Sequence, residues 1–145
     1  LDDILRTAVH TYAGQFIRAK VRLQYAPVET TVLTDEKWLE FVVEQLLSNA
    51  LKYAPGGTVT ISMEAPGLLA IADDGIGIAP EDLPRIFEKG YTGYNGRVQK
   101  RASGIGLYLC KCICTNLGHT IEAESKVGEG TVITIDFSQI KLEVE

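Results

Sequence analysis

Three polar residues between 44 and 54 stand at regular intervals: an amide at Gln45, a second amide at Asn49 and an ammonium group at Lys52. Side chains four and then three residues apart lie on one side of a helix, so the three form a polar stripe. An amide oxygen suits a hard cation such as Mg²⁺, and a nearby lysine suits the phosphates that accompany such a cation. An ordinary solvated stripe is the alternative, and this helix alone does not decide between them.

Three glycine motifs follow. The Asp-x-Gly-x-Gly motif at 73–77 ends a predicted strand, where a carboxylate can accept from an exocyclic amine and glycines let a ring approach the backbone. The Gly-x-Gly-Leu motif at 104–107 opens a predicted helix, whose free N–H groups favour phosphate. The Gly-x-Gly-Thr motif at 128–131 fits a hairpin turn. Each motif is weak alone, because a simple turn or helix start explains it equally well.

Length and composition bound the protein class. The chain has 145 residues, 46% of them hydrophobic and 23% charged, as in one globular domain with a good core. The net charge of −5 argues against nucleic acid as a partner. No apolar run reaches membrane-spanning length and no signal peptide opens the chain. The chain begins with Leu1, so we expect a piece of a longer protein.

The three cysteines lie within five residues, at Cys110, Cys112 and Cys114. On a helix, Cys110 and Cys114 share a face while Cys112 points away, so three thiolates do not converge on one metal. The odd count and close spacing also disfavour disulfides. Small buried apolar side chains are therefore the favoured interpretation.

Hydrophobic periodicity predicts the elements that must position these motifs. The organising helix starts after an N-cap at Asp35 and ends at 55–57, with a core face at Leu39, Val42, Val43, Leu46 and Ala50. A segment at 89–101 has no periodicity and is predicted to be a functional loop. This mixture of helices and strands predicts an α+β fold with one mixed sheet and the helices on one face. The other predicted elements are helices at 1–20 and 103–117, a helical turn at 81–87, and strands at 21–25, 30–33, 58–64, 68–72, 120–125 and 131–137.

The order of the motifs is more specific than any one of them. Along essentially the whole chain they resemble the N, F and three glycine boxes of the ATP-binding domain of sensor histidine kinases. That domain is the kinase branch of the gyrase, Hsp90, histidine kinase and MutL superfamily. The matching residues are Asn49-x-x-Lys52-Tyr53, Asp73-x-Gly75-x-Gly77, Phe87, Gly104-x-Gly106 and Gly128-x-Gly130.

This resemblance implies a Bergerat fold, a two-layer α/β sandwich with about three helices on a mixed sheet, which binds ATP and Mg²⁺. By the same resemblance, ATP lies between the organising helix and a lid at 79–103. Asn49 holds the metal, Lys52 and Tyr53 approach the phosphates and ribose, and Asp73 reads adenine. The catalytic residues are then Asn49, Lys52 and Gln45. The ATP-binding residues are Asn49, Lys52, Tyr53, Asp73, Gly75, Gly77, Ile78, Phe87, Arg97, Lys100, Arg101, Gly104, Ile105, Gly106, Leu107 and Thr131.

Two departures from the family pattern are informative. Gln45 stands where the gyrase and MutL branches place a glutamate that activates water, and an amide cannot act as that base, so hydrolysis is disfavoured. Gly90 stands three residues after Phe87, where relatives often carry a second aromatic residue. The segment 88–96 resembles that of kinases sensing cell-wall-active peptide antibiotics.

The function implied is transfer of the ATP γ-phosphoryl group to a histidine on a separate dimerisation domain, in two-component signalling. His10 and His119 lack the acceptor's context, so we expect the acceptor histidine to precede Leu1. The partners implied are ATP, that dimerisation domain and, through it, a response regulator. The expected location is the cytoplasmic part of a membrane-anchored bacterial sensor kinase. The alternatives are a gyrase- or MutL-type ATPase, an anti-sigma serine kinase, and a silent ATP-sensing module.

Overall fold

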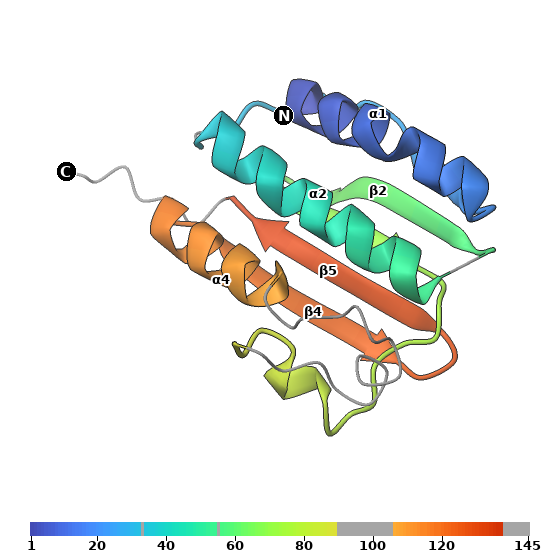
Figure 1. The fold of residues 1–145 in the computed structure, drawn as a ribbon. Coiled ribbons are helices and arrows are strands. Elements are labelled where there is room, and N and C mark those ends of the chain that lie inside the picture. Colours follow the sequence, from blue (N-terminus) through green and yellow to red (C-terminus); the bar gives the residue numbers. More distant parts are fainter. Residues whose placement is uncertain (33, 55, 90–105, 138–145) are drawn as a thin grey trace.

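The computed structural model describes residues 1–32, 34–54, 56–89 and 106–137, arranged as a layer of helices on a sheet (Figure 1). The predicted loop at 89–101 falls almost wholly outside the described residues. The helices are α1 (Asp2–Arg18), α2 (Glu36–Tyr53), α4 (Gly106–Leu117) and the short 3-10 helix η1 (Leu83–Arg85). The strands are β1 (Arg22–Tyr25), β2 (Thr58–Ala65), β3 (Leu68–Asp73), β4 (Thr120–Lys126) and β5 (Gly130–Asp136).

The five strands form one mixed sheet in the order β1-β2-β3-β5-β4. β1 and β2 are parallel, and every other neighbouring pair is antiparallel. Helices α1, α2 and α4 lie side by side over one face of the sheet (Figure 1). The predicted α+β class, with a mixed sheet and three helices on one face, is therefore confirmed.

The central helix α2 forms where the sequence predicts it. The Asp35 side chain accepts a hydrogen bond from the Trp38 amide at 3.0 Å and so satisfies one of the free donors of the first turn. The predicted core face is buried throughout, joined by Leu47. These side chains meet the apolar face of the sheet and the buried residues of α1 and α4 in one core. Burial of such side chains is the main favourable term in folding and fixes α2 against the sheet.

Two local predictions need correction. No strand forms at residues 30–32, although their alternation suggests one, and Leu33 lies outside the described residues. Instead the carboxylate of Asp2 binds the amides of Val28 and Glu29, and Glu29 has φ of +52°, which is incompatible with an extended strand. The helical turn predicted at 81–87 is shorter than expected, because only Leu83–Arg85 is helical.

The cysteines of α4 behave as apolar side chains. Cys110 and Cys114 are fully buried in the core, whereas Cys112 is half-buried, as the helical spacing predicts. Burial raises the pKa of the Cys110 thiol to about 12 and that of Cys114 to about 11. Both thiols therefore stay protonated at neutral pH and pack as small hydrophobic groups.

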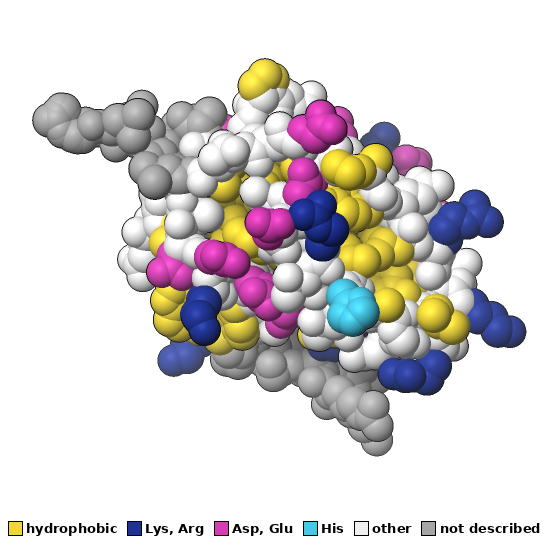
Figure 2. All heavy atoms as spheres, turned by 90° about the horizontal axis from the view of Figure 1, so that it is seen from above, with side chains coloured by type: hydrophobic (Ala, Val, Ile, Leu, Met, Phe, Trp, Pro, Cys, Tyr) yellow, Lys and Arg dark blue, Asp and Glu magenta, His cyan; other side chains and the backbone are white. Residues whose placement is uncertain are grey.

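Figure 2 views the molecule from the top of Figure 1, and acidic and apolar side chains gather on this side. A shallow groove on α1 is lined by Arg6, Thr7, Val9, His10, Thr11 and Ala13, and His10 is exposed. None of the predicted site residues lines it. Within the described part of the chain, no helix is long and apolar enough to cross a membrane.

Candidate nucleotide-binding site

The inner face of the sheet changes from apolar to polar at one end. Register partners on antiparallel strands share a face, so β3, β5 and β4 present three rows of side chains towards the helices. Two rows belong to the core and the third is polar. In order, the rows are Leu69–Ile135–Ile121, Ile71–Ile133–Ala123 and Asp73–Thr131–Ser125. A polar row that continues a buried apolar face is unusual for packing alone and indicates a binding site.

Asp73 begins this polar row at the end of β3. Its carboxylate accepts the Gly75 amide at 2.9 Å and is also hydrogen-bonded by the main chain of Thr131. The side chain is half-buried, and this burial raises its pKa despite the two amides, which act in the opposite direction. A carboxylate with lone pairs remaining in a partly dry setting can accept from a donor on a ligand.

The turn after β3 is pressed against the end of α2. A Cβ added at Gly75 would overlap the Tyr53 carbonyl oxygen and contact the side chain of Ala54. The next residue, Ile76, donates its main-chain amide to that same Tyr53 carbonyl at 3.0 Å. Glycine is therefore required at 75, and it brings the motif at 73–77 beside the last turn of α2.

The same turn also contacts the hairpin between β4 and β5. Gly77 has φ of +80°, and a Cβ there would overlap the Lys126 carbonyl oxygen. Gly130 has φ of +116°, and a Cβ there would overlap the Asp73 carbonyl oxygen. The first and third glycine motifs thus meet backbone to backbone, which only glycine permits.

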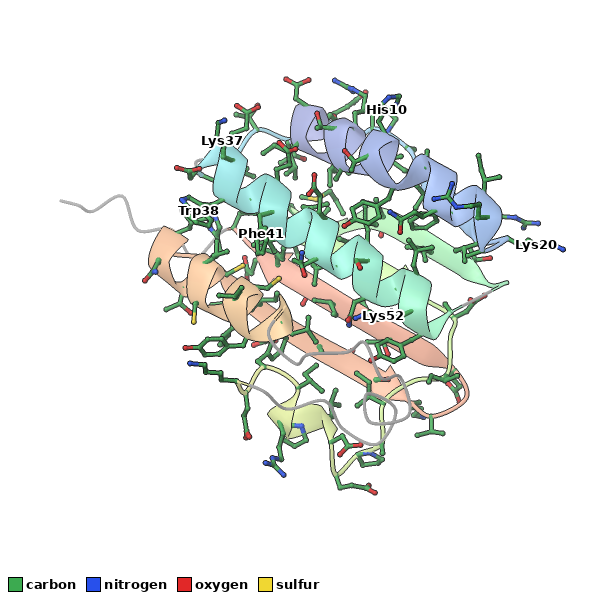
Figure 3. The ribbon with its side chains drawn as sticks, in the orientation of Figure 1. His10, Lys20, Lys37, Trp38, Phe41 and Lys52 are labelled. Atoms are coloured by element: carbon green, nitrogen blue, oxygen red, sulfur yellow. The ribbon has the colours of Figure 1, made fainter. Side chains whose placement is uncertain are left out.

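The polar stripe of α2 faces the start of α4. A Cβ added at Gly106, the first residue of α4, would lie only 2.7 Å from the Gln45 amide oxygen. Asn49 is half-buried, and Lys52 is exposed on the side of α2 that faces away from α1 (Figure 3). Gly106 and the turn at 73–77 therefore both pack on the C-terminal half of α2.

Four further predicted residues are apolar or partly apolar and none of them is fully exposed. Ile78 is half-buried, while Phe87 and Leu107 are partly buried and pack on the core. The ammonium of Lys111 lies 5.9 Å from the centre of the Phe87 ring, within the range of a cation–π contact. Tyr53 is half-buried, and this burial raises the pKa of its hydroxyl.

Ser125 was missed by the sequence analysis. Its hydroxyl contacts the Ile78 amide at 2.8 Å, the Gly130 carbonyl at 2.7 Å and the Thr131 hydroxyl at 2.9 Å. The predicted hairpin held the necessary signal, because pairing 120–125 with 131–137 puts Ser125 opposite Thr131. Both residues of this register pair are polar, which indicates a binding site rather than core packing.

Five predicted residues lie outside the described residues: Arg97, Lys100, Arg101, Gly104 and Ile105. Most of the predicted lid at 79–103 lies there too. Within the described residues, no group of three or more His, Cys, Asp or Glu side chains is placed to hold a metal ion. The chemistry of an amide oxygen, together with phosphate oxygens, is compatible with Mg²⁺.

Comparison with known proteins defines the family. Residues 34–141 match the family described as histidine kinase-, DNA gyrase B- and HSP90-like ATPases. This match covers more than half of the chain and all the glycine motifs, so the chain belongs to this family, and the resemblance inferred from the motif order is confirmed.

Named relatives place the chain near sensor kinases. It is 38% identical over 140 residues to the sensor protein BceS of Halalkalibacterium halodurans, covering 94% of this chain and 42% of the relative. It is 34% identical over 143 residues to the sensor histidine kinase YxdK of Bacillus subtilis, covering 94% and 44% respectively. The chain thus spans less than half the length of these relatives.

Solved structures support the fold. A mycobacterial sensor histidine kinase, MprB, superposes with a TM-score of 0.78 at 24% identity, over 92% of this chain and 91% of that chain. The catalytic domain of histidine kinase ThkA superposes with a TM-score of 0.77 at 18% identity, over 94% and 91%. At these identities the likeness establishes the shared fold.

Proposed function

We propose that this chain is the catalytic domain of a sensor histidine kinase, which binds Mg²⁺-ATP and transfers the γ-phosphoryl group to a histidine on a separate dimerisation domain. The observation that carries the proposal is the convergence of two glycine motifs on the C-terminal half of α2. There the turn at 73–77 packs on Tyr53, and Gly106 packs on Gln45. Family membership and the names of the relatives support the same conclusion.

Each residue has a role that follows from its chemistry. Asp73 and Thr131 face the base, and Asp73 accepts from the adenine amine. The Asn49 amide oxygen fits as a ligand of Mg²⁺, which when bound neutralises phosphate charge, and the exposed ammonium of Lys52 binds phosphate. The start of α4 at Gly106 offers main-chain amides to the phosphates. Phosphoryl transfer needs mainly such placement and charge stabilisation, so no covalent residue is required.

Gln45 favours kinase over hydrolase. A neutral amide cannot take a proton from water, so the position lacks the general base that hydrolysis needs. The lid at 79–103, with Arg97, Lys100 and Arg101 on the γ-phosphate, belongs to the same proposal. So do a cytoplasmic location in a membrane-anchored parent protein and a response regulator as the later acceptor. We retain the ATPase, serine kinase and silent sensing module as outcomes of the test.

A transfer assay in trans tests the proposal. The chain is mixed with the purified dimerisation domain of its parent protein and γ-labelled ATP, and we expect acid-labile, alkali-stable label on that domain. Asn49→Ala should abolish Mg²⁺-dependent ATP binding in calorimetry with little loss of stability. Asn116→Ala, an exposed asparagine on α4, is the matched control and should leave both unchanged.

The alternatives give different results. Steady release of labelled phosphate without transfer would indicate an ATPase, and acid-stable label on serine a serine kinase. Binding without either reaction would indicate a sensing module. Absence of ATP binding would contradict the proposal altogether.

A further inference from the structure

The hydroxyl of Ser125 joins three segments of the site, and no role described so far uses it. It lies on β4, and its contacts reach the Ile78 amide in the turn after β3 and both Gly130 and Thr131 on β5. All three distances, 2.8, 2.7 and 2.9 Å, are those of good hydrogen bonds. One small side chain therefore connects the turn of the first glycine motif to the strand that carries Thr131.

Counting protons determines the direction of each bond. A serine hydroxyl has one proton and two lone pairs. The Ile78 amide can only donate, so it uses one lone pair, and the Gly130 carbonyl can only accept, so it uses the single proton. The contact with Thr131 must then have the threonine hydroxyl as donor. Ser125 is fully satisfied, and Thr131 has only lone pairs left.

We infer that Ser125 is a positioning residue for base selection, which fixes the Thr131 hydroxyl as an acceptor. Asp73 is the register partner of Thr131 on β3, and its carboxylate is also an acceptor. Two acceptors side by side match the amino group at position 6 of adenine and oppose the carbonyl at that position in hypoxanthine or guanine. The inference rests on the proposed function, because it assumes that the base lies against Asp73 and Thr131.

An intervening water would transmit the same preference. A water that donates one proton to Thr131 and the other to the Asp73 carboxylate has only lone pairs left for the base, and these again accept from an amine. Without Ser125 the Thr131 hydroxyl can rotate and donate, and the site can then satisfy a carbonyl. Loss of Ser125 therefore relaxes selectivity, whereas a purely structural loss would weaken all nucleotides alike.

The test compares Mg²⁺-ATP with Mg²⁺-ITP, which carries a carbonyl at position 6, in calorimetric titrations of the whole chain. We expect the wild-type chain to prefer ATP, and Ser125→Ala to reduce the ratio of the two affinities by about tenfold, the order of one hydrogen bond. Ser125→Thr keeps the hydroxyl and should restore the ratio. Ser62→Ala is the matched control, because the Ser62 hydroxyl bonds the exposed carboxylate of Glu64 on β2.

A double-mutant cycle separates positioning from general damage. In a Thr131→Val background there is no hydroxyl to orient, so Ser125→Ala should not change the ratio further. Two results would overturn the inference while leaving the proposed function intact. One is an unchanged ratio of ATP to ITP affinity in Ser125→Ala. The other is a loss of that ratio in the Thr131→Val background as large as in the wild-type background. A wild-type chain that binds neither nucleotide would overturn both. If Ser125→Ala does not fold, Ser125→Cys, with a weak S–H donor, takes its place with the same expectation.

Discussion

The first turn of α1 and the end of β3 each hold an aspartate that accepts main-chain amides, but the two carboxylates have opposite pKa shifts. Asp2 accepts from the amides of Val28 and Glu29 at 2.8 and 2.9 Å and from the hydroxyl of Tyr25. The pKa of Asp2 is lowered, chiefly by the Tyr25 bond. The pKa of Tyr25 is raised to about 12, by burial and by the bond to Asp2.

At Asp73 burial dominates. Two amides favour the charged form, as at Asp2, but the carboxylate sits in a partly dry pocket and its pKa is raised. Burial opposes charge more strongly than these two bonds support it. Asp2 is a structural clamp that holds the segment after β1 on α1, and its ionisation stabilises the fold. Ionised Asp73 instead lowers the stability of the empty protein, as expected of a group kept for a ligand.

The largest expected effect concerns the rigidity of the Asp73 environment. Gly75→Ala should lower the free energy of unfolding by about 3 kcal/mol, because the new Cβ overlaps the Tyr53 carbonyl and displaces the amide that Asp73 accepts. Gly128→Ala is the control: it has φ of +83° but nothing within 4 Å, so only backbone strain of about 1 kcal/mol applies. Urea titrations measure both. Similar losses of unfolding free energy in the two variants would mean that the turn at 73–77 moves freely. The environment of Asp73 would then be no more rigid than that of Asp2.

The second prediction separates binding from stability. Asp73→Asn should weaken ATP binding by about 1–3 kcal/mol, because half of the acceptor becomes a donor that faces the adenine amine. Its free energy of unfolding should be higher, since the cost of burying the charge is removed. Asp2→Asn, measured beside it by calorimetry, should bind ATP normally. Normal ATP binding by Asp73→Asn would show that another group reads the base.

The third prediction concerns the clamp at Asp2. Asp2→Asn should lower the free energy of unfolding by about 1 kcal/mol, because its amide nitrogen cannot accept from the donors that now surround the carboxylate. Asp3→Asn is the control, because the Asp3 side chain forms an exposed ion pair with Arg6 and its loss should change stability by less than about 0.5 kcal/mol. Thermal melts in one buffer compare them, and equal effects would refute the clamp.

Local patterns predicted the helices and most strands well. The Asp35 cap and the apolar spacing of α2 are properties of neighbouring residues, so the sequence displays them directly. The order of the glycine motifs predicted the family, because it carries the resemblance. Apart from the hairpin of β4 and β5, local patterns could not show which strands pair, and the parallel pairing of β1 with β2 appears only in the structure.

Long-range contacts explain the misses. The Ser125 hydroxyl accepts a hydrogen bond from the Ile78 amide, which is 47 positions away in the chain. The false strand at 30–33 alternates correctly, but Asp2 fixes the preceding residues in a bend through bonds that span 26 and 27 positions. The hydrophobic periodicity of a short stretch of sequence cannot predict either of these contacts between distant residues.

The smallest expected effect is a difference in pH dependence between the two aspartates. The folded-state pKa of Asp2 is depressed, so its stabilising contribution is complete above the unfolded value of about 3.9 and is lost as pH falls through the folded pKa. The folded-state pKa of Asp73 is raised, so its ionised form subtracts stability at neutral pH. That subtraction fades as pH falls through the folded pKa towards the unfolded value.

Urea titrations of the nucleotide-free chain between pH 3 and 7 would measure these contributions as differences from wild type. The deficit of Asp2→Asn should be constant near neutrality and should shrink below about pH 4, where the wild-type carboxylate takes up its proton. The excess stability of Asp73→Asn should begin to shrink at a higher pH, because the wild-type Asp73 is protonated earlier in the folded state. The two differences thus have opposite signs and disappear in a defined order. If they disappeared together, the two carboxylates would share one environment, and burial could not be what distinguishes Asp73, the proposed adenine-binding residue, from Asp2.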